Sequence, residues 1–393
     1  MRNIIFVQPN QIGLDVLPIQ WQKIAHSKRK RKRALPIGMF YLMVNIGMPI
    51  QYIDNYMSQL SNSELAKHCI DTVGPEGLVC FGGTCFEWLQ AKQVANLVKQ
   101  KMPQIKTIYG GPNAKARPNK HAKYFDHIFT CGEDFLKYMG MDDNLKIWPT
   151  MLDIKRRHPN IDLRYYAHNN IFSGHGCPFN CRFCASKYIN NRQVYFRPVD
   201  NIITEIKQCG HKYIIFREDN FIINKDRLKL LCRELARLGV KWECQARVSS
   251  LDSKTIKLLK DSGCVLISCG FESACDATLK YIDKGHTVSD MNNVIELFRK
   301  HNMYYTGGFI VGLPNEGKQE VRTTIDFINK LRTDPLSRVP SKPVQFLGLP
   351  VSDLYFEVIK QDLVNYNWCD GELLLCDTGH IKFGDVERMI HEG

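Results

Sequence analysis

Three cysteines stand close together near the middle of the chain, in the stretch Cys177-Pro-Phe-Asn-Cys181-Arg-Phe-Cys184. Glycines at positions 174 and 176 precede them, and glycine lets a backbone approach a bound group closely. Three thiolates on one short loop can hold one face of an iron–sulfur cluster. A [4Fe–4S] cube has one more iron than this loop has cysteines. The sequence therefore predicts a cluster with one iron open to a further ligand.

A structural zinc site is the alternative, and zinc would need a fourth protein ligand. His175 is the nearby candidate, but it lies two residues before Cys177, which is a poor reach. A zinc ribbon would need a second Cys-x-x-Cys pair, and the sequence has none elsewhere. The other cysteines, of 15 in all, are irregularly spaced, which argues against a disulfide framework and for a reducing compartment.

The chain is basic, with a net charge of +13 over 393 residues. Such a charge favours anionic partners and leaves nucleic acid open, although no nucleic-acid-binding motif supports it. The run Lys28–Arg33 could be a solvated loop, a nucleic-acid contact or a nuclear address. The N-terminus shows no signal-peptide pattern and no apolar run is long enough to span a bilayer, so we expect a cytoplasmic protein without a membrane span.

Strand-like and helix-like segments alternate through the first part of the chain, which is typical of a parallel sheet. The expected strands are 3–8, 49–54, 77–81, 105–109 and 127–130, and the expected helices are 36–46, 61–73 and 86–102. Ser61 and Glu64 have the spacing of a helix-capping box. Small and polar residues follow the strands: Pro9, Asn10, Asp54, Gly82 to Thr84, Gly110 to Asn113, Gly132 and Glu133. Because parallel strands end at one edge of a sheet, these residues predict a ligand-binding edge, although each glycine could also be ordinary turn punctuation.

The second part repeats a strand followed by a helix six times, which favours an open, partial barrel. The expected strands are 169–173, 213–216, 241–246, 265–269, 305–311 and 344–347, and the expected helices are 200–208, 225–238, 253–261, 274–282, 289–300, 316–331 and 352–361. The cysteine loop directly follows the first of these strands. Barrel enzymes place their chemistry at the carboxyl ends of the strands, where this loop lies.

The cysteine motif, with Phe183 before its last cysteine, resembles the signature of the radical S-adenosylmethionine (SAM) superfamily. Further segments resemble that family in order: Arg217–Phe221, Gln245–Arg247, Gly270–Ser273, Lys284–His286, Gly307–Pro314 and Phe346–Tyr355. The resemblance implies that Cys177, Cys181 and Cys184 bind a [4Fe–4S] cluster. It also implies a set of SAM contacts, which are Phe183, Glu218, Arg247, Glu272, Gly308, Ile310 and Gly312. Arg247 and Glu272 could instead form an ion pair that braces the barrel.

The first part of the chain resembles the cobalamin-binding domain that is often fused to this barrel. The cobalamin-type edge would comprise Asp54, Gly82, Thr84, Gly110, Gly111, Gly132 and Glu133, and the segment Pro36-Ile-Gly38 also matches. The Asp-x-His-x-x-Gly segment that supplies an axial histidine in other cobalamin proteins is absent. The resemblance therefore implies either cobalamin bound without a histidine ligand or a domain that binds nothing.

We therefore expect an α/β protein with an N-terminal Rossmann-like doubly wound parallel sheet followed by a partial (β/α)6 TIM-type barrel. The expected divisions are 1–135 for the first domain, 136–167 for a linker, 168–361 for the barrel and 362–393 for a C-terminal tail. The resemblance implies an enzyme that generates a 5′-deoxyadenosyl radical, draws electrons from a low-potential donor such as flavodoxin or ferredoxin, and transfers a methyl group or carries out a related modification. The alternatives are a methylthiotransferase acting on RNA and a non-catalytic iron–sulfur protein. The substrate cannot be read from the sequence.

Overall fold

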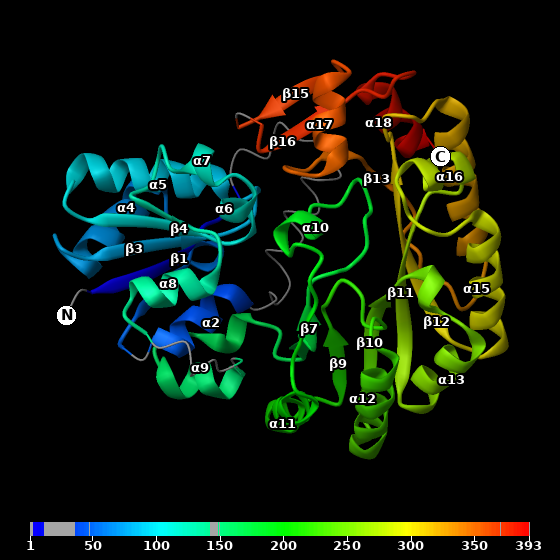
Figure 1. The fold of residues 1–393 in the computed structure, drawn as a ribbon, viewed down its shortest axis with the longest axis horizontal. Coiled ribbons are helices and arrows are strands. Elements are labelled where there is room, and N and C mark those ends of the chain that lie inside the picture. The colour runs from blue at the N-terminus through cyan, green and yellow to red at the C-terminus, as the bar shows by residue number, and fades with distance from the viewer. Residues whose placement is uncertain are drawn as a thin grey trace. The chain divides into compact units, whose positions relative to one another are not determined.

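The computed structural model describes residues 3–11, 36–46, 48–141, 148, 150–369 and 371–392. The chain divides into two compact units, Met1–His168 and Asn169–Gly393 (Figure 1). The basic run 28–33 lies outside the described residues, so its role stays a prediction.

The first unit is built on a parallel sheet with the strand order β2-β1-β3-β4-β5. The strands are β1 (Ile4–Gln8), β2 (Gln51–Asp54), β3 (Leu78–Gly82), β4 (Lys106–Gly110) and β5 (His127–Phe129). Every residue of β1 and β3 is buried, because helices cover both faces of the sheet. The order places a reversal of winding direction between β1 and β3, the point at which doubly wound sheets bind ligands.

Eight α-helices belong to the described part of this unit. They are α2 (Ile37–Ile46), α3 (Asn55–Ser58), α4 (Asn62–Val73), α5 (Trp88–Lys101), α6 (Pro112–Ala116), α7 (Pro118–His121), α8 (Gly132–Tyr138) and α9 (Met151–Arg157), followed by the 3-10 turn η2 (Leu163–Tyr165). Helices α4 and α5 lie on one face of the sheet, and α2 and α8 lie on the other (Figure 1). The predicted capping box at the start of α4 is confirmed, since Ser61 and Glu64 each accept a hydrogen bond from the other's backbone N–H.

The segment 136–167, which the sequence analysis predicts to be a linker, differs from that prediction. It contains α9 and η2, and the side chains of Ile154 and Tyr166 are buried in the core of the first unit. The Tyr166 hydroxyl also donates to Asp54 over 2.7 Å. The segment contains prolines and many charged residues, and its apolar residues are scattered among them. They therefore show no clear helical or strand period from which these elements could be predicted.

The second unit is built on a six-stranded parallel sheet with the order β13-β12-β11-β10-β9-β6. Its strands are β6 (Asn170–Ile171), β9 (Tyr213–Phe216), β10 (Lys241–Ala246), β11 (Cys264–Glu272), β12 (Tyr304–Val311) and β13 (Val344–Gln345). The strands follow one another in sequence order across the sheet, as in an open half-barrel. The predicted fold class is confirmed: a Rossmann-like parallel sheet precedes a six-stranded parallel half-barrel.

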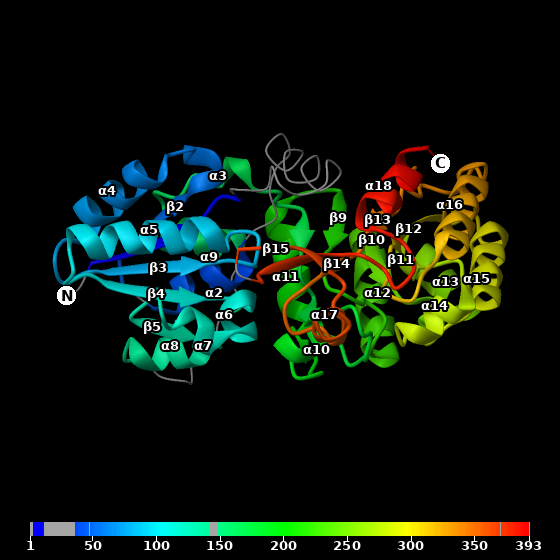
Figure 2. The same cartoon turned by 90° about the horizontal axis from the view of Figure 1, so that it is seen from above.

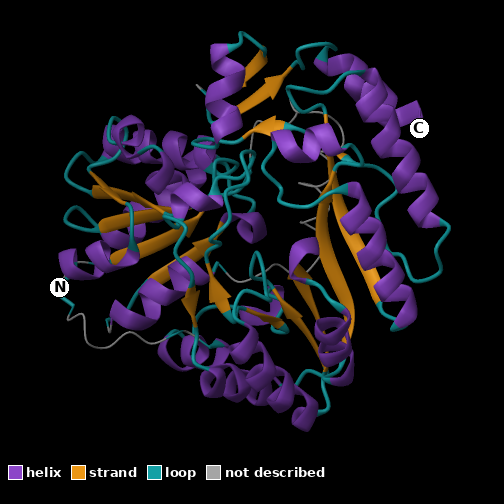
Figure 3. Cartoon of the chain, turned by 45° about the vertical axis from the view of Figure 1, so that its right-hand side comes forward, coloured by secondary structure: helices purple, strands orange, loops and turns teal. Residues whose placement is uncertain are grey.

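Helices follow the outer side of this sheet (Figures 2 and 3). They are α11 (Val199–Cys209), α12 (Lys225–Leu238), α13 (Ser253–Asp261), α14 (Asp276–Tyr281), α15 (Val288–Lys300) and α16 (Lys318–Arg332). Also present are α17 (Asp353–Lys360), the short α10 (Ser186–Ile189) and the 3-10 turn η3 (Val248–Ser250). Burial alternates along the strands: in β10, Trp242, Cys244 and Ala246 are buried in the core, whereas Lys241 and Gln245 are exposed. The helices therefore cover one face of the sheet, and the other face carries the more exposed side chains.

Residues 362–393, which are predicted to be a C-terminal tail, contain regular structure. The strands β14 (Leu347–Gly348), β15 (Val364–Trp368) and β16 (Leu373–Cys376) form an antiparallel sheet, and α18 (Phe383–Glu392) follows. Val386 and Ile390 of α18 pack against Val321 and Ile325 of α16 in a small apolar cluster. None of the helices in the described ranges has the length and apolar character needed to cross a membrane.

Candidate functional site

The cysteine loop begins at a two-stranded hairpin formed by β7 (Gly174–His175) and β8 (Tyr195–Phe196). Gly176 has a φ angle of +93°, and a β-carbon there would lie 2.0 Å from the carbonyl oxygen of Gln193. Only glycine fits this position, because both the conformation and the space exclude a side chain. The chain can therefore turn sharply just before Cys177.

Main-chain hydrogen bonds tie the middle of the loop to two distant segments. The Arg182 N–H donates to the Ile282 carbonyl over 3.0 Å, and the Arg182 carbonyl accepts from the Leu354 N–H over 3.1 Å. The Arg182 guanidinium pairs with Glu357 of α17 and donates to the Tyr281 carbonyl. The loop is therefore anchored on both sides by residues about a hundred or more positions away in sequence.

The three thiols share one environment. Burial raises the pKa of Cys177 and raises that of Cys184 to about 11. A negative charge on Cys181 adds to the rise in both pKa values. Two of the sulfurs accept hydrogen bonds: Cys184 from the Ser186 N–H at 3.4 Å, and Cys181 from Arg247 at 3.0 Å. Among the described residues, no three His, Cys, Asp or Glu side chains come close enough to share a single metal ion. Three thiols on one glycine-flanked loop, two of them with N–H donors, fit the donor set of an iron–sulfur cluster.

Charged side chains are buried at the carboxyl ends of three neighbouring strands. Glu218 follows β9, Arg247 follows β10 and Glu272 ends β11, and each is less than a tenth exposed. Glu218 accepts a hydrogen bond from the Ser173 hydroxyl, and burial raises the pKa of this carboxyl. The arrangement places three predicted SAM contacts at the ends of adjacent strands.

Glu272 sits on strained backbone. Its φ angle is +69°, at a bulge where β11 loses register with β12, and its carboxylate pairs with Lys284 at 2.8 Å. A non-glycine residue in this conformation costs free energy and is concentrated at functional sites. The alternative that Arg247 and Glu272 pair with each other is wrong, because Lys284 is the partner of Glu272.

His286 lies beside this pair and is 8% exposed, next to the backbone of Phe271. Burial lowers its pKa to about 4, and the positive charge of Lys284 adds to this effect. The imidazole is therefore neutral at physiological pH.

The remaining predicted SAM contacts have different surroundings. Phe183 packs against the core of the second unit, with the Lys284 ammonium 5.7 Å from its ring centre. Gly308 is exposed and a β-carbon there would meet no atom within 4 Å, whereas Ile310 packs on the core. Gly312 has a φ angle of +76°, a conformation that favours glycine. The turn itself therefore accounts for this glycine, whether or not a ligand binds there.

A buried acid that was not predicted from the sequence lies beside this turn. Glu316 is fully buried and accepts hydrogen bonds from the backbone N–H groups of Gly312 and Leu313 at 2.8 and 3.1 Å. Burial raises its pKa to about 7. Glu316 follows Pro314 and Asn315, a context typical of an exposed loop, so no signal in the sequence marks it.

In the first unit, the predicted edge residues do lie at the carboxyl ends of the strands. Asp54, Gly82 and Gly110 are the last residues of β2, β3 and β4. The Asp54 carboxylate caps α3 through the Tyr56 N–H at 3.0 Å and also accepts from Tyr166. Asp54 therefore has a structural role in the first unit.

Backbone packing accounts for part of the glycine pattern. Gly111 has a φ angle of +100°, and a β-carbon there would lie 3.0 Å from the Gly83 carbonyl oxygen. Gly132 and Glu133 begin α8, and a β-carbon on Gly132 would approach Leu42 to 3.2 Å. The loops after β3 and β4 therefore touch through their backbones. A β-carbon on Gly110 would be tolerated, because it would lie 3.7 Å from the Phe129 carbonyl oxygen.

A second buried acid, Glu87, organises this edge and was not predicted. Its carboxylate accepts hydrogen bonds from the Thr84 N–H and hydroxyl, from the Tyr56 hydroxyl at 2.7 Å and from the Gln11 amide at 3.1 Å. Thr84 is exposed above it. The network joins the ends of β1, β2 and β3 at the reversal of the sheet, where doubly wound folds bind ligands.

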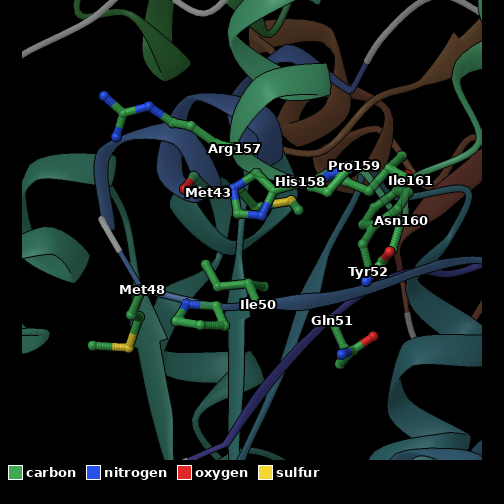
Figure 4. Close-up of a pocket in the computed structure, with 11 residues that line it drawn as sticks. Met43, Met48, Ile50, Gln51, Tyr52, Arg157, His158, Pro159, Asn160 and Ile161 are labelled. Atoms are coloured by element: carbon green, nitrogen blue, oxygen red, sulfur yellow. Dashed lines mark hydrogen bonds between the residues drawn. The ribbon is translucent and has the colours of Figure 1, made fainter.

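A cavity of about 380 Å³ lies elsewhere in the first unit, toward the start of β2 (Figure 4). Its lining is polar and apolar in about equal measure and comprises Met43, Met48, Pro49, Ile50, Gln51, Tyr52, Arg157, His158, Pro159, Asn160 and Ile161. Arg157 donates to the Val44 carbonyl at 2.7 Å, and His158 bonds the Met43 carbonyl at 3.0 Å. These two basic residues thus satisfy carbonyls at the end of α2.

Residues 171–328 match the family model described as the radical SAM superfamily. An uncharacterized methyltransferase of Pyrococcus horikoshii is 27% identical over 342 residues, which are 76% of this chain and 74% of the relative. A bacteriochlorophyllide d C-12(1)-methyltransferase of Chlorobaculum tepidum is 28% identical over 206 residues, or 50% of this chain and 44% of that protein.

Two solved structures share the fold over 99% of this chain. The radical SAM methyltransferase TsrM of Kitasatospora setae, solved with cobalamin and a [4Fe–4S] cluster, has a TM-score of 0.65 at 14% identity over 85% of its chain. The cobalamin-dependent SAM radical enzyme OxsB has a TM-score of 0.70 at 14% identity over 66% of its chain. The matched segment begins within β6 and contains all three cysteines and the buried charges at the strand ends. Residues 171–328 thus form a radical SAM domain, of a superfamily whose cofactors are a [4Fe–4S] cluster and SAM.

Proposed function

We propose that this chain is a cobalamin-dependent radical SAM methyltransferase whose cluster is bound by Cys177, Cys181 and Cys184. The observation that carries the proposal is the cysteine loop itself, anchored beside the strand ends within the segment that matches the superfamily. Methyl transfer is supported by the named activities of the Pyrococcus and Chlorobaculum relatives. Cobalamin is supported by TsrM and OxsB, which share the fold of both units.

The residues at the strand ends would hold SAM. Buried carboxylates at Glu218 and Glu272 suit a cationic ligand, and the open backbone at Gly308 leaves room for one. Phe183 and Ile310 supply apolar surface nearby, and Gly312 shapes the turn after β12. His286, kept neutral by burial, adds no charge to this region.

Cobalamin would bind at the carboxyl edge of the first sheet. The proposed contacts are the predicted edge residues Asp54, Gly82, Thr84, Gly110, Gly111, Gly132 and Glu133. The Glu87 network would fix the loops after β1 and β3, and Asp54 would act through the helix it caps. No Asp-x-His-x-x-Gly segment is present, so we expect no axial histidine from that motif.

When bound, the reduced cluster and SAM supply a 5′-deoxyadenosyl radical, and cobalamin supplies a methyl group. The chain's own part is to hold these groups in fixed positions and to exclude water. The anchoring of the loop through Arg182 would hold the cluster in a fixed position. The buried side chains of Glu218 and Glu272 would hold SAM in a region that excludes water. A low-potential donor such as flavodoxin or ferredoxin would deliver the electron.

Anaerobic purification tests the proposal directly. We expect about four iron atoms per chain, cobalt after loading with a corrinoid, and 5′-deoxyadenosine on incubation with SAM and a reductant. Replacing Cys177, Cys181 and Cys184 with alanine should abolish iron binding, whereas Cys209→Ala, outside the loop, should not. Iron without 5′-deoxyadenosine would favour a non-catalytic protein, and roughly eight iron atoms would favour a methylthiotransferase with a second cluster.

A further inference from the structure

Arg247 is held at the end of β10 by contacts on several sides. Its Nη1 donates to the Cys181 sulfur at 3.0 Å, and its Nη2 donates to the Lys284 carbonyl. The guanidinium carbon lies 3.9 Å from the ring centre of Phe179, a close cation–π contact. The residue is 7% exposed, so the guanidinium has little freedom to move elsewhere.

The charge of Arg247 lacks an acidic partner among the residues that the structure describes. The nearest buried carboxylate, Glu272, is already paired with Lys284 at 2.8 Å. The Nε atom of Arg247 has no hydrogen-bond partner either. A buried guanidinium without a carboxylate is costly unless another group supplies negative charge. Of the two acceptors described for the guanidinium, the Lys284 carbonyl is neutral, so the Cys181 sulfur is where that charge is expected.

We propose that Arg247 is a positioning residue that acts on the iron–sulfur cluster through the Cys181 sulfur and raises the reduction potential of the cluster. The inference rests on the proposed function, because it requires that Cys181 bind the cluster. Hydrogen bonds to cluster sulfurs and nearby positive charge stabilise the reduced, more negative state. The family resemblance assigns Arg247 to SAM, whereas its contacts point to the sulfur.

Redox titration of the reconstituted full chain, followed by electron paramagnetic resonance of the reduced cluster, tests this role. In Arg247→Gln we expect the equilibrium constant for one-electron reduction to fall at least tenfold, which is a shift of about 59 mV to more negative potential. Arg247→Lys keeps the charge but not the fork of donors, so its shift should be smaller and in the same direction.

Arg299→Gln is the matched control. Arg299 lies on α15, outside the cysteine loop, and its guanidinium pairs with Asp334 at 2.8 Å, with no hydrogen bond to a sulfur. We therefore expect its cluster potential to stay within about threefold of the wild-type equilibrium constant, or roughly 30 mV. An equal shift in the two glutamine variants would mean that charge alone matters, and it would overturn the role of the sulfur contact.

The outcomes separate this inference from the proposed function. A wild-type chain that takes up no cluster would overturn both. A wild-type cluster whose potential is unchanged in Arg247→Gln, together with weakened SAM binding by calorimetry, would overturn the inference alone and assign Arg247 to the ligand. If both Arg247 variants fold by circular dichroism yet bind no iron, Arg247 is required to retain the cluster, and a role confined to its potential is refuted.

Discussion

Replacing Glu316 with glutamine should remove part of the pH dependence of the stability of the second unit. Glu316 is fully buried between the turns after β11 and β12, and burial raises its pKa from 4.5 to about 7. The folded protein therefore holds this proton more tightly than the unfolded chain does. The stabilisation from this proton is present below about pH 4.5 and is lost as the pH rises through about 7.

The size of the effect follows from the two pKa values. A rise from 4.5 to about 7 corresponds to about 3 kcal/mol, at about 1.4 kcal/mol for each pH unit. Glutamine keeps one oxygen that can accept from the N–H groups of Gly312 and Leu313. It carries no ionisable proton, so this part of the pH dependence disappears.

Urea unfolding followed by circular dichroism at pH 5 and pH 8 measures the difference. Between these values, which do not span the whole titration, the wild-type chain should lose about 2.5 kcal/mol of stability relative to Glu316→Gln. Asp326→Asn, at an exposed position on α16, controls for the loss of one negative charge. Parallel pH profiles for the wild type and Glu316→Gln would refute the reasoning, since the buried carboxyl would then not titrate differently on unfolding.

Three further substitutions test the geometry of both units. Gly176→Ala should abolish iron binding, measured by metal analysis, because its β-carbon would collide with the carbonyl of Gln193; normal iron content would show that the loop can close another way. Tyr166→Phe should cost about 2 kcal/mol in chemical unfolding, because it removes the hydroxyl that bonds Asp54; an unchanged midpoint would contradict that. Gly308→Ala should leave the melting temperature unchanged, because its β-carbon meets no atom, but should weaken SAM binding in equilibrium dialysis; unchanged binding would remove this residue from the SAM site.

Elements with a regular hydrophobic period could be predicted well from the sequence. The bounds of β9, β10, α12 and α13 agree with the expected ranges to the residue. In α12, for example, Leu228, Leu231, Cys232 and Leu235 form one buried stripe at helical spacing. Such elements bury a single face, so local spacing carries most of the information about them.

Elements that depend on distant partners could not be predicted in this way. The two-residue strands β7 and β8 are too short for a period, and α9 carries few apolar residues in a charged segment. Helix α18 is different: Val386, Met389 and Ile390 are buried at helical spacing, so the sequence does contain its signal, although this helix was not predicted.

The limit set by distant partners applies to the site as well. Arg247 meets Cys181 across 66 positions of sequence, and Glu87 meets Gln11 across 76. A sequence motif shows which kinds of residue could form a site. Which other side chains they contact depends on how the chain folds.

The alternation of burial along β10 separates two kinds of constraint within one strand. Trp242, Cys244 and Ala246 are fixed by close packing against helices, and changing them would create cavities or overpack the core. Lys241 and Gln245 have no such neighbours to satisfy, so they can be exchanged at little thermodynamic cost. The exposed positions of β10 can therefore change with little effect on stability, whereas the buried positions of the same strand cannot.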